Sequence, residues 1–288
     1  MRNDEHKRSP AGLHGIHLIV IAAFLIPACD GGTGVSDGGD AGDVIGYDAD
    51  QGSGDFSDGS DAWDGSAADV DPWADWDPDP GCARFAGLGG QDLRDALLQE
   101  VDDQDALSYD DARQQLFSFI DNIDGRVQGV YTGRWVVTDD IPDASVMNTE
   151  HTWCQSWGAD VLPAKSDLNH LFPTISNVNS VRSNYPFGEV VEVSWSQDGS
   201  LKGRDGWGSL VFEPRDPHKG DCARAMFYFA VRYSMEIPDR EEAVLKWWNA
   251  FDLPDSKERD RLDRIEQIQQ KRNPFVDCPE LVDRIENY

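Results

Sequence analysis

Residues 148–157 read NTEHTWCQSW, a stretch that places the Glu150 carboxylate directly beside the His151 imidazole. Downstream, SDLNHLFPT at 166–174 and NVNSVRSNYPFGE at 177–189 supply a second histidine, several amides and an arginine. Carboxylate and amide oxygens are hard ligands that suit Mg²⁺, with Ca²⁺ or Mn²⁺ as alternatives. An imidazole with an ordinary pKa, about 6.5, can take a proton from water near neutral pH. Together with a phosphate-binding arginine, these residue types favour metal-assisted hydrolysis of a phosphodiester.

Amphipathic helices and short strands surround this stretch. Apolar residues recur at helical spacing in five segments, 93–101, 109–120, 221–233, 239–251 and 255–271. Strands are predicted at 129–132, 134–138, 145–151, 189–195 and 209–213. The mixed order predicts an α+β fold, a mainly helical domain around a small sheet. Residues 82–288 are enough for one well-filled domain.

Several separated blocks, in the same order, resemble the endonuclease I family of secreted, non-specific nucleases, which belongs to the His-Me finger (ββα-metal) group. Besides the three stretches above, the resemblance rests on YDDA at 109–112, VYTG at 130–133, KGDCARAMFY at 219–228 and RNPFVD at 272–277. It covers most of 90–285. It implies a strand–loop–helix finger and an endonuclease that cuts DNA, with RNA as a second substrate, and leaves 5′-phosphate ends.

The resemblance also implies roles for individual residues. His151 matches the general base that activates water, while Glu150 and Asn179 match the ligands of a single divalent metal. His170 and Asp167 are expected to support the site by packing and orientation. Because neighbouring residues on a regular strand point to opposite faces, Glu150 and His151 are expected at a strand end or an irregularity.

Four cations are candidates for binding the substrate phosphate: Arg182, Lys165, Lys219 and Arg224. For Arg182 the alternative is that it holds the finger together, and for Arg224 that it anchors its helix through a buried ion pair. His218, beside Lys219, is predicted to lie in a solvated turn that faces DNA.

The charge balance excludes a protein that holds polyanions by its overall positive charge. The chain has 25 Lys and Arg against 54 Asp and Glu, a formal net charge of −29. The segment 161–235, in contrast, contains equal numbers of acidic and basic residues. We therefore expect a small local groove, a metal requirement and weak or strongly salt-dependent binding of nucleic acid.

The N-terminal region predicts export to the bacterial cell envelope. An apolar run over 16–28 follows Lys7 and Arg8, which predicts a signal peptide at 1–28. Cys29 is predicted to carry lipid, as in bacterial lipoproteins, so the protein would face the periplasm or the exterior on a membrane anchor. An ordinary cleaved signal is the alternative. Residues 29–81, rich in Asp and Gly, predict a disordered tether, and the folded part is expected to be monomeric.

Four further cysteines follow Cys29. An even number in an exported domain favours two disulfides, which could be connected in three ways. The preferred pairing is Cys82–Cys278, which joins the two ends of the domain, and Cys154–Cys222. A four-thiolate zinc site is the rival, but no C-x-x-C spacing supports it.

Two other functions compete with the nuclease. One is a catalytically inactive surface lipoprotein that binds nucleic acid or a protein partner. The other is a zinc hydrolase using His151, His170 and His218, whose spacing matches no compact zinc motif.

Overall fold

The computed structural model describes residues 71, 73–74, 76–103 and 105–288. The predicted signal peptide, Cys29 and most of the predicted tether lie outside the described residues. Within this part of the chain, no helix combines the length and the apolar character needed to cross a bilayer.

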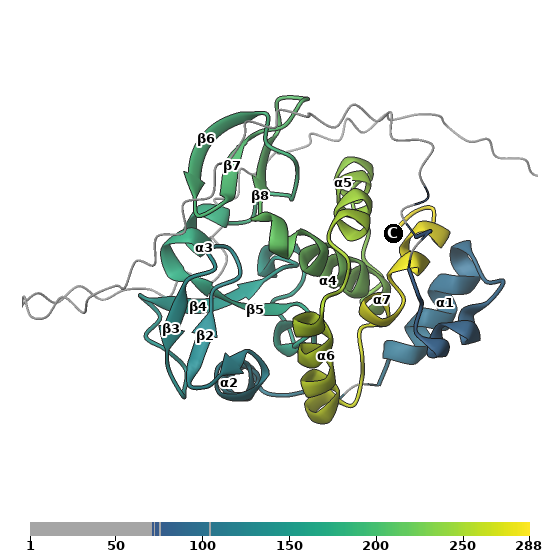
Figure 1. Ribbon diagram of the computed structural model, residues 1–288, viewed down its shortest axis with the longest axis horizontal. Coiled ribbons are helices and arrows are strands. Elements are labelled where there is room, and N and C mark those ends of the chain that lie inside the picture. The colour runs from purple at the N-terminus through teal and green to yellow at the C-terminus, as the bar shows by residue number, and fades with distance from the viewer. Residues whose placement is uncertain (1–70, 72, 75, 104) are drawn as a thin grey trace, which may run out of the picture.

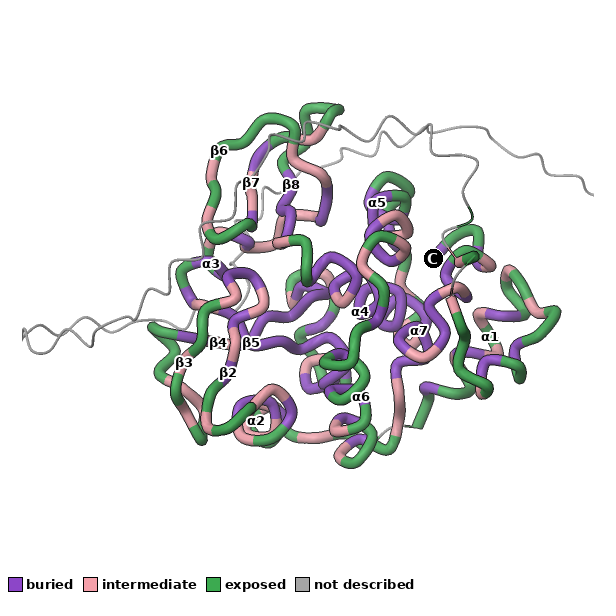
Figure 2. The backbone as a smooth tube through the Cα atoms, in the orientation of Figure 1, coloured by how far each residue is buried: buried purple, intermediate pink, exposed green. Residues whose placement is uncertain are grey.

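The centre of the molecule is the helix α4, Lys219–Arg232, which has strands on one side and α1, Gly90–Val101, on the other (Figure 1). All but two of its residues are buried, as the tube in Figure 2 shows. Its sequence KGDCARAMFYFAVR is apolar around most of its circumference, which is typical of a helix inside a core. Two further helices pack against it, α5, Asp239–Phe251, and α7, Pro274–Asp277, and α6, Ser256–Gln269, packs against α7.

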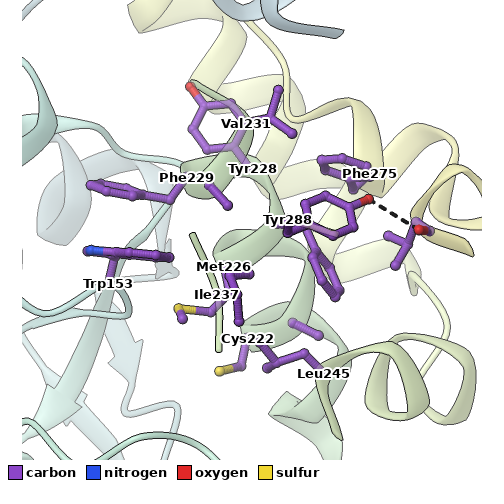
Figure 3. Packing of buried hydrophobic residues seen from close by; sticks show 14 of the residues in the cluster. Trp153, Cys222, Met226, Tyr228, Phe229, Val231, Ile237, Leu245, Phe275 and Tyr288 are labelled. Atoms are coloured by element: carbon purple, nitrogen blue, oxygen red, sulfur yellow. Dashed lines mark hydrogen bonds between the residues drawn. The ribbon is translucent and has the colours of Figure 1, made fainter. Parts of the chain in front are cut away.

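Aromatic side chains fill the space between α4 and its neighbours (Figure 3). Trp153 stacks on Phe229 with ring centroids 4.9 Å apart, and Phe227 lies 4.4 Å from Tyr288. Trp153 lies two residues after His151 in the sequence. The packing of Trp153 in the core therefore holds in place the backbone segment that follows Glu150 and His151.

The strands form three small antiparallel sheets rather than the single small sheet that was predicted, within an α+β fold that confirms the predicted class. The first contains β1, Asn122–Ile123, β2, Arg126–Gln128, and β3, Trp135–Val137. The second pairs β4, Met147–His151, with β5, Leu171–Ile175. The third contains β6, Glu192–Gln197, β7, Ser200–Arg204, and β8, Leu210–Glu213.

The strand predicted at 129–132 is wrong, because this segment is the turn that joins β2 to β3. The Gly133 N–H donates to the Gly129 carbonyl, and Gly133 has φ +70°. A side chain at Gly133 would be strained in this left-handed conformation. The glycine therefore allows the turn between β2 and β3.

The β4–β5 hairpin leads directly into the short helix α3, Ser176–Arg182. In the hairpin His151 is paired with Leu171, and Glu150 with Phe172. One face of the hairpin packs on α2, Tyr109–Gln115, and on the π-helical turn that continues it, Leu116–Ile120. The two strands and the helix that follow each other here carry Glu150, His151, Asn179 and Arg182.

A disulfide between Cys82 and Cys278 closes the domain, as predicted, across a sequence separation of 196 residues. The short 3₁₀ helix η1 spans Pro80–Phe85, and the Trp73 indole donates to Asp283 at 2.7 Å. Trp73, near the end of the predicted tether, thus contacts the C-terminal segment.

Candidate active site

His151 is the last residue of β4, and its imidazole is buried. Its Nε2 lies 3.2 Å from the Lys165 carbonyl oxygen. A carbonyl can only accept, so Nε2 carries the hydrogen and Nδ1 keeps its lone pair. Among the described residues Nδ1 has no hydrogen-bond partner. The backbone of Lys165 thus selects the tautomer in which Nδ1 is a base.

The His151 ring is neutral at physiological pH. Burial lowers its pKa well below 6.5, and the neighbouring His170 ring lowers it further. The contact with the Lys165 carbonyl opposes these effects, because it favours a protonated Nε2. A neutral imidazole is the form that can accept a proton.

Glu150 makes its contacts on the other face of β4. The Tyr131 hydroxyl donates to Glu150 Oε1 at 2.9 Å, and Arg182 Nε lies 3.0 Å from the same oxygen. The His151 ring instead lies against Tyr109 and His170. The alternation of a regular strand therefore holds up to His151, and the site extends over both faces at the end of β4.

Asn179 lies on α3, beside the strand that carries Glu150. Its Nδ2 donates to Asn148 Oδ1 at 2.8 Å and to the Thr149 carbonyl at 3.4 Å. Its Oδ1 is buried and has no hydrogen-bond partner among the described residues. A buried amide oxygen and a carboxylate oxygen are both ligand types that fit a hard cation such as Mg²⁺. Glu150 and Asn179 are thus compatible with the predicted metal.

Arg182 is enclosed by protein groups, and these contacts favour the second of its two predicted roles, that of holding the finger together. Its side chain is fully buried, and its Nε pairs with Glu150. The rest of the guanidinium donates to the Cys154 sulfur and to the carbonyls of Thr152, Ser183 and Tyr185. A guanidinium enclosed in this way joins α3 to β4 and cannot face a phosphate in solvent.

The predicted Cys154–Cys222 disulfide is wrong. Both residues are buried thiols. Arg182 Nη1 lies 2.9 Å from Cys154 Sγ, while Cys222 belongs to the apolar core around α4. Burial raises the pKa of the Cys222 thiol well above its usual range. Each sulfur therefore has a packing role of its own.

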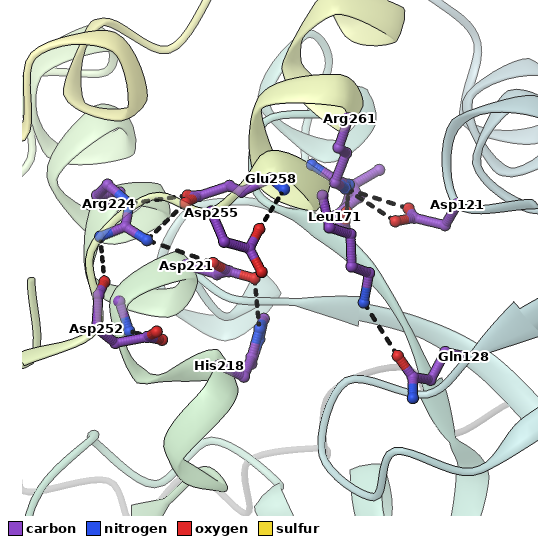
Figure 4. Close-up of polar contacts among 12 residues, drawn as sticks. Asp121, Gln128, Leu171, His218, Asp221, Arg224, Asp252, Asp255, Glu258 and Arg261 are labelled. Atoms are coloured by element: carbon purple, nitrogen blue, oxygen red, sulfur yellow. Dashed lines mark hydrogen bonds and ion pairs between the residues drawn. The ribbon is translucent and has the colours of Figure 1, made fainter.

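Lys219 and Arg224 are also buried, contrary to the prediction that they bind phosphate. Lys219 Nζ lies 2.8 Å from Glu213 and 3.3 Å from Glu189. Arg224 forms two hydrogen bonds with Glu258, at 2.8 and 2.6 Å (Figure 4). These ion pairs anchor α4 to β8 and α6. The alternative role considered for Arg224 is the one that the geometry supports.

His218 is buried, so the predicted solvated turn is wrong. Its Nδ1 lies 3.4 Å from Asp221 (Figure 4), and its ring packs edge-on against Tyr131 and Phe172. The Tyr131 hydroxyl donates to Glu150, so Tyr131 lies between the His218 ring and the Glu150 carboxylate. The sequence contained Tyr131 in the block VYTG, but nothing in the sequence alone assigned it to the carboxylate.

Asp167 and His170 lie in the loop between β4 and β5. Asp167 accepts hydrogen bonds from the hydroxyls of Tyr228 and Tyr233, and Arg232 pairs with it at 3.3 Å. His170 Nε2 lies 2.7 Å from the Ala164 carbonyl. Both residues fix the loop that presents the Lys165 carbonyl to His151.

Among the described residues, only Cys82, Cys278 and Glu280 bring three candidate His, Cys, Asp or Glu ligands together, and the two cysteines form the disulfide. The three histidines of the alternative zinc site are not gathered around one point. His151 and His170 have ring centroids 5.6 Å apart, while His218 packs with Tyr131 and Phe172. The candidate metal ligands Glu150 and Asn179 would instead supply oxygen atoms.

This combination of a tautomer-selected histidine and hard oxygen donors is accompanied by similarity to known nucleases. The sequence pattern of the family described as Endonuclease I matches residues 96–280. The chain belongs to the endonuclease I family. It is 37% identical over 159 residues to an extracellular ribonuclease of Bacillus subtilis (strain 168), covering 48% of this chain and 53% of that protein. It is 28% identical over 118 residues to a periplasmic deoxyribonuclease of Aeromonas hydrophila, covering 39% and 48% of the two chains.

A third relative is an endonuclease-1 of Buchnera aphidicola subsp. Acyrthosiphon pisum (strain APS), 30% identical over 115 residues, which are 39% of this chain and 44% of that protein. This member of the endonuclease I family thus spans about half the length of the curated relatives it matches.

Proposed function

We propose that this protein is a metal-dependent nuclease that hydrolyses phosphodiester bonds of DNA, with RNA as a second substrate, and leaves 5′-phosphate ends. The observation that carries the proposal is the hydrogen bond from His151 Nε2 to the Lys165 carbonyl, which leaves a basic Nδ1. Relatives named as a ribonuclease and as a deoxyribonuclease support both substrates.

In the proposed reaction Nδ1 of His151 takes a proton from the attacking water. The hydrogen on Nε2 stays there and is donated to the Lys165 carbonyl oxygen, which also stabilises the imidazolium that forms. Glu150 and Asn179 would hold one divalent cation, Mg²⁺ with Ca²⁺ or Mn²⁺ as alternatives. When bound, such a cation supplies positive charge that stabilises the negative charge developing on the phosphate and the leaving oxygen.

Two substitutions test the base and the metal site separately in the full-length protein. His151→Ala should lower cleavage of plasmid DNA by about 10²- to 10⁴-fold, the usual contribution of a general base. His218→Gln is the matched control, because it changes another buried histidine of lowered pKa. Undiminished cleavage by His151→Ala would exclude the proposed base.

For the metal, Asn179→Ala removes the proposed ligand oxygen, whereas Asn148→Ala removes only the partner of the amide nitrogen. We expect Asn179→Ala to raise the Mg²⁺ concentration for half-maximal activity by about 10-fold or more, and Asn148→Ala to change it less. Equal effects of the two variants would argue for a structural role of Asn179. Cleavage that persists in EDTA would contradict a metal requirement.

The second candidate is a catalytically inactive protein that binds nucleic acid or a protein partner. Burial of the His151 ring favours it, because a base must reach the water beside its substrate. The same assays distinguish the two, since this candidate predicts binding without Mg²⁺-stimulated cleavage. We further propose the bacterial cell envelope as the location, with a lipid on Cys29, supported by relatives named as extracellular or periplasmic.

A further inference from the structure

One aromatic ring lies beside the His151 imidazole, and two cations lie against that ring. The Tyr109 ring has its centroid 5.5 Å from that of His151. Lys165 Nζ lies 4.8 Å from the centre of the Tyr109 ring, and Arg113 Cζ lies 5.8 Å from it. Tyr109 and Arg113 are four residues apart on α2, so they share one face of the helix.

The members of this cluster are more exposed than the candidate site residues. Glu150, His151 and Asn179 are at most 1% exposed. Tyr109, Arg113 and Lys165, in contrast, are partly exposed. A phosphate in solvent can therefore contact this cluster, whose ring lies against the buried imidazole.

The two cations keep their charge unneutralised within the described part of the chain. Neither Arg113 nor Lys165 forms an ion pair with a described carboxylate, and Arg113 Nε, although buried, has no described hydrogen-bond partner. An aromatic ring attracts a cation without cancelling its charge. The cluster thus differs from the buried ion pairs of Arg182, Lys219 and Arg224.

We propose that Arg113 and Lys165, positioned by the Tyr109 ring, bind a backbone phosphate of the nucleic acid that flanks the bond to be cut. The inference rests on the proposed nuclease function and names the residues that hold its polymeric substrate. Lys165 then has two roles: its carbonyl selects the His151 tautomer, and its ammonium group binds the phosphate. Only the second role depends on the side chain.

Binding tests this proposal without relying on cleavage. In full-length His151→Ala protein with Mg²⁺, the affinity for a fluorescein-labelled DNA duplex is measured by anisotropy between about 50 and 200 mM salt. Arg113→Gln and Lys165→Gln should each weaken binding and lower the slope of log K against log salt by about 0.9, the loss of one phosphate contact. Arg113→Lys, which keeps the charge, should restore most of the affinity. The comparison with Arg113→Gln thus separates the loss of the charge from the loss of the fold.

Matched controls come from cations in similar ring contacts elsewhere. Arg126 lies 5.4 Å from the centre of Trp135, and Lys202 lies 5.3 Å from that of Tyr185. We expect Arg126→Gln and Lys202→Gln to retain wild-type affinity and salt slope. If the Arg113 and Lys165 variants match these controls, the proposed phosphate site is excluded.

A cleavage assay separates this outcome from failure of the nuclease assignment. In an otherwise wild-type protein, Arg113→Gln should lower kcat/KM on DNA, while the hydrolysis of thymidine 5′-monophosphate p-nitrophenyl ester, which has no flanking phosphate, stays unchanged. Equal losses on both substrates would contradict the flanking-phosphate role. If the wild-type protein cleaves neither substrate, the nuclease function fails, whereas the salt slopes still decide whether Arg113 and Lys165 bind phosphate.

Discussion

At the scale of single residues, one backbone carbonyl determines what His151 can do. Because the Lys165 oxygen accepts from Nε2, the ring can take a proton only at Nδ1. Burial keeps the imidazole neutral to lower pH than an exposed histidine, since the pKa is lowered well below 6.5. The imidazole is thus in the protonation state that the proposed base requires throughout the neutral range.

A pH profile tests this consequence. We expect kcat/KM on DNA to be independent of His151 titration at pH 6.5 and above, and to fall only where the free enzyme's imidazole gains a proton, well below pH 6.5. Single-turnover cleavage at several pH values, with tryptophan fluorescence to monitor folding, measures this. An acid limb centred at or above pH 6.5 would contradict the lowered pKa.

The lowered histidine pKa values should also make the stability of the fold decrease at acidic pH. His151, His170 and His218 all have pKa values lowered by burial, so below pH 6.5 the unfolded chain binds more protons than the folded chain. The histidines therefore destabilise the fold as the pH falls through 6.5. Glu241 has the opposite effect on stability. Burial raises its pKa to about 7, so the folded chain binds this proton at higher pH than the unfolded chain does, and the fold is stabilised as the pH falls below 7.

At the scale of secondary structure elements, Arg182 holds α3 on the hairpin. Its ion pair with Glu150 and its hydrogen bonds to the segment after β4 lie entirely inside the protein. The same pair sets the position of the carboxylate that we propose as a metal ligand. The local order strand, strand and helix is thus maintained by one guanidinium in addition to the backbone hydrogen bonds of the hairpin.

Removal of this guanidinium should be costly. Arg182→Met leaves the Glu150 carboxylate buried without its ion pair, which typically lowers the free energy of unfolding by about 3–5 kcal/mol. Urea denaturation measures the loss, and Lys202→Met, which changes a partly exposed cation, serves as control. The double variant Glu150→Gln/Arg182→Met should recover part of the stability. A wild-type midpoint for Arg182→Met would exclude the scaffold role.

How far the sequence predicts this region depends on the range of the interactions. The Glu-His pair and the helical spacing of α4 are local, so the α+β class and the position of His151 near a strand end followed from the sequence. The partners of Arg224 and Lys219, by contrast, come from other elements, Glu258 on α6 and Glu213 on β8. Without those contacts, a basic residue near the motif resembles a phosphate ligand.

Tyr109 and Arg113 escaped the sequence-based assignment for the same reason. They precede His151 by about forty residues, and only the packing of α2 on the hairpin brings them to the imidazole. The YDDA block indicated that this segment belongs to the family pattern, but the sequence alone did not indicate which face of the helix meets the site.

At the scale of the whole molecule, the Cys82–Cys278 disulfide joins segments near both ends of the described domain. A crosslink across 196 residues restricts the unfolded chain strongly, by about 5 kcal/mol in the chain-entropy estimate. We therefore expect a reducing agent to shift the urea midpoint of the wild-type protein downward. The double variant Cys82→Ser/Cys278→Ser should start from the lower midpoint and not respond to the reducing agent. A response of the double variant would implicate the Cys154 and Cys222 thiols.

The position of this crosslink also dictates when it can be made. The two thiols are separated by 196 residues, so the ring can close only after the whole segment between them has been synthesised. In a reducing cytoplasm the finished polypeptide still lacks the bond, and it gains it only in an oxidising compartment. Production of the recombinant protein in the bacterial periplasm should therefore yield the closed form directly, whereas cytoplasmic material must be oxidised after purification.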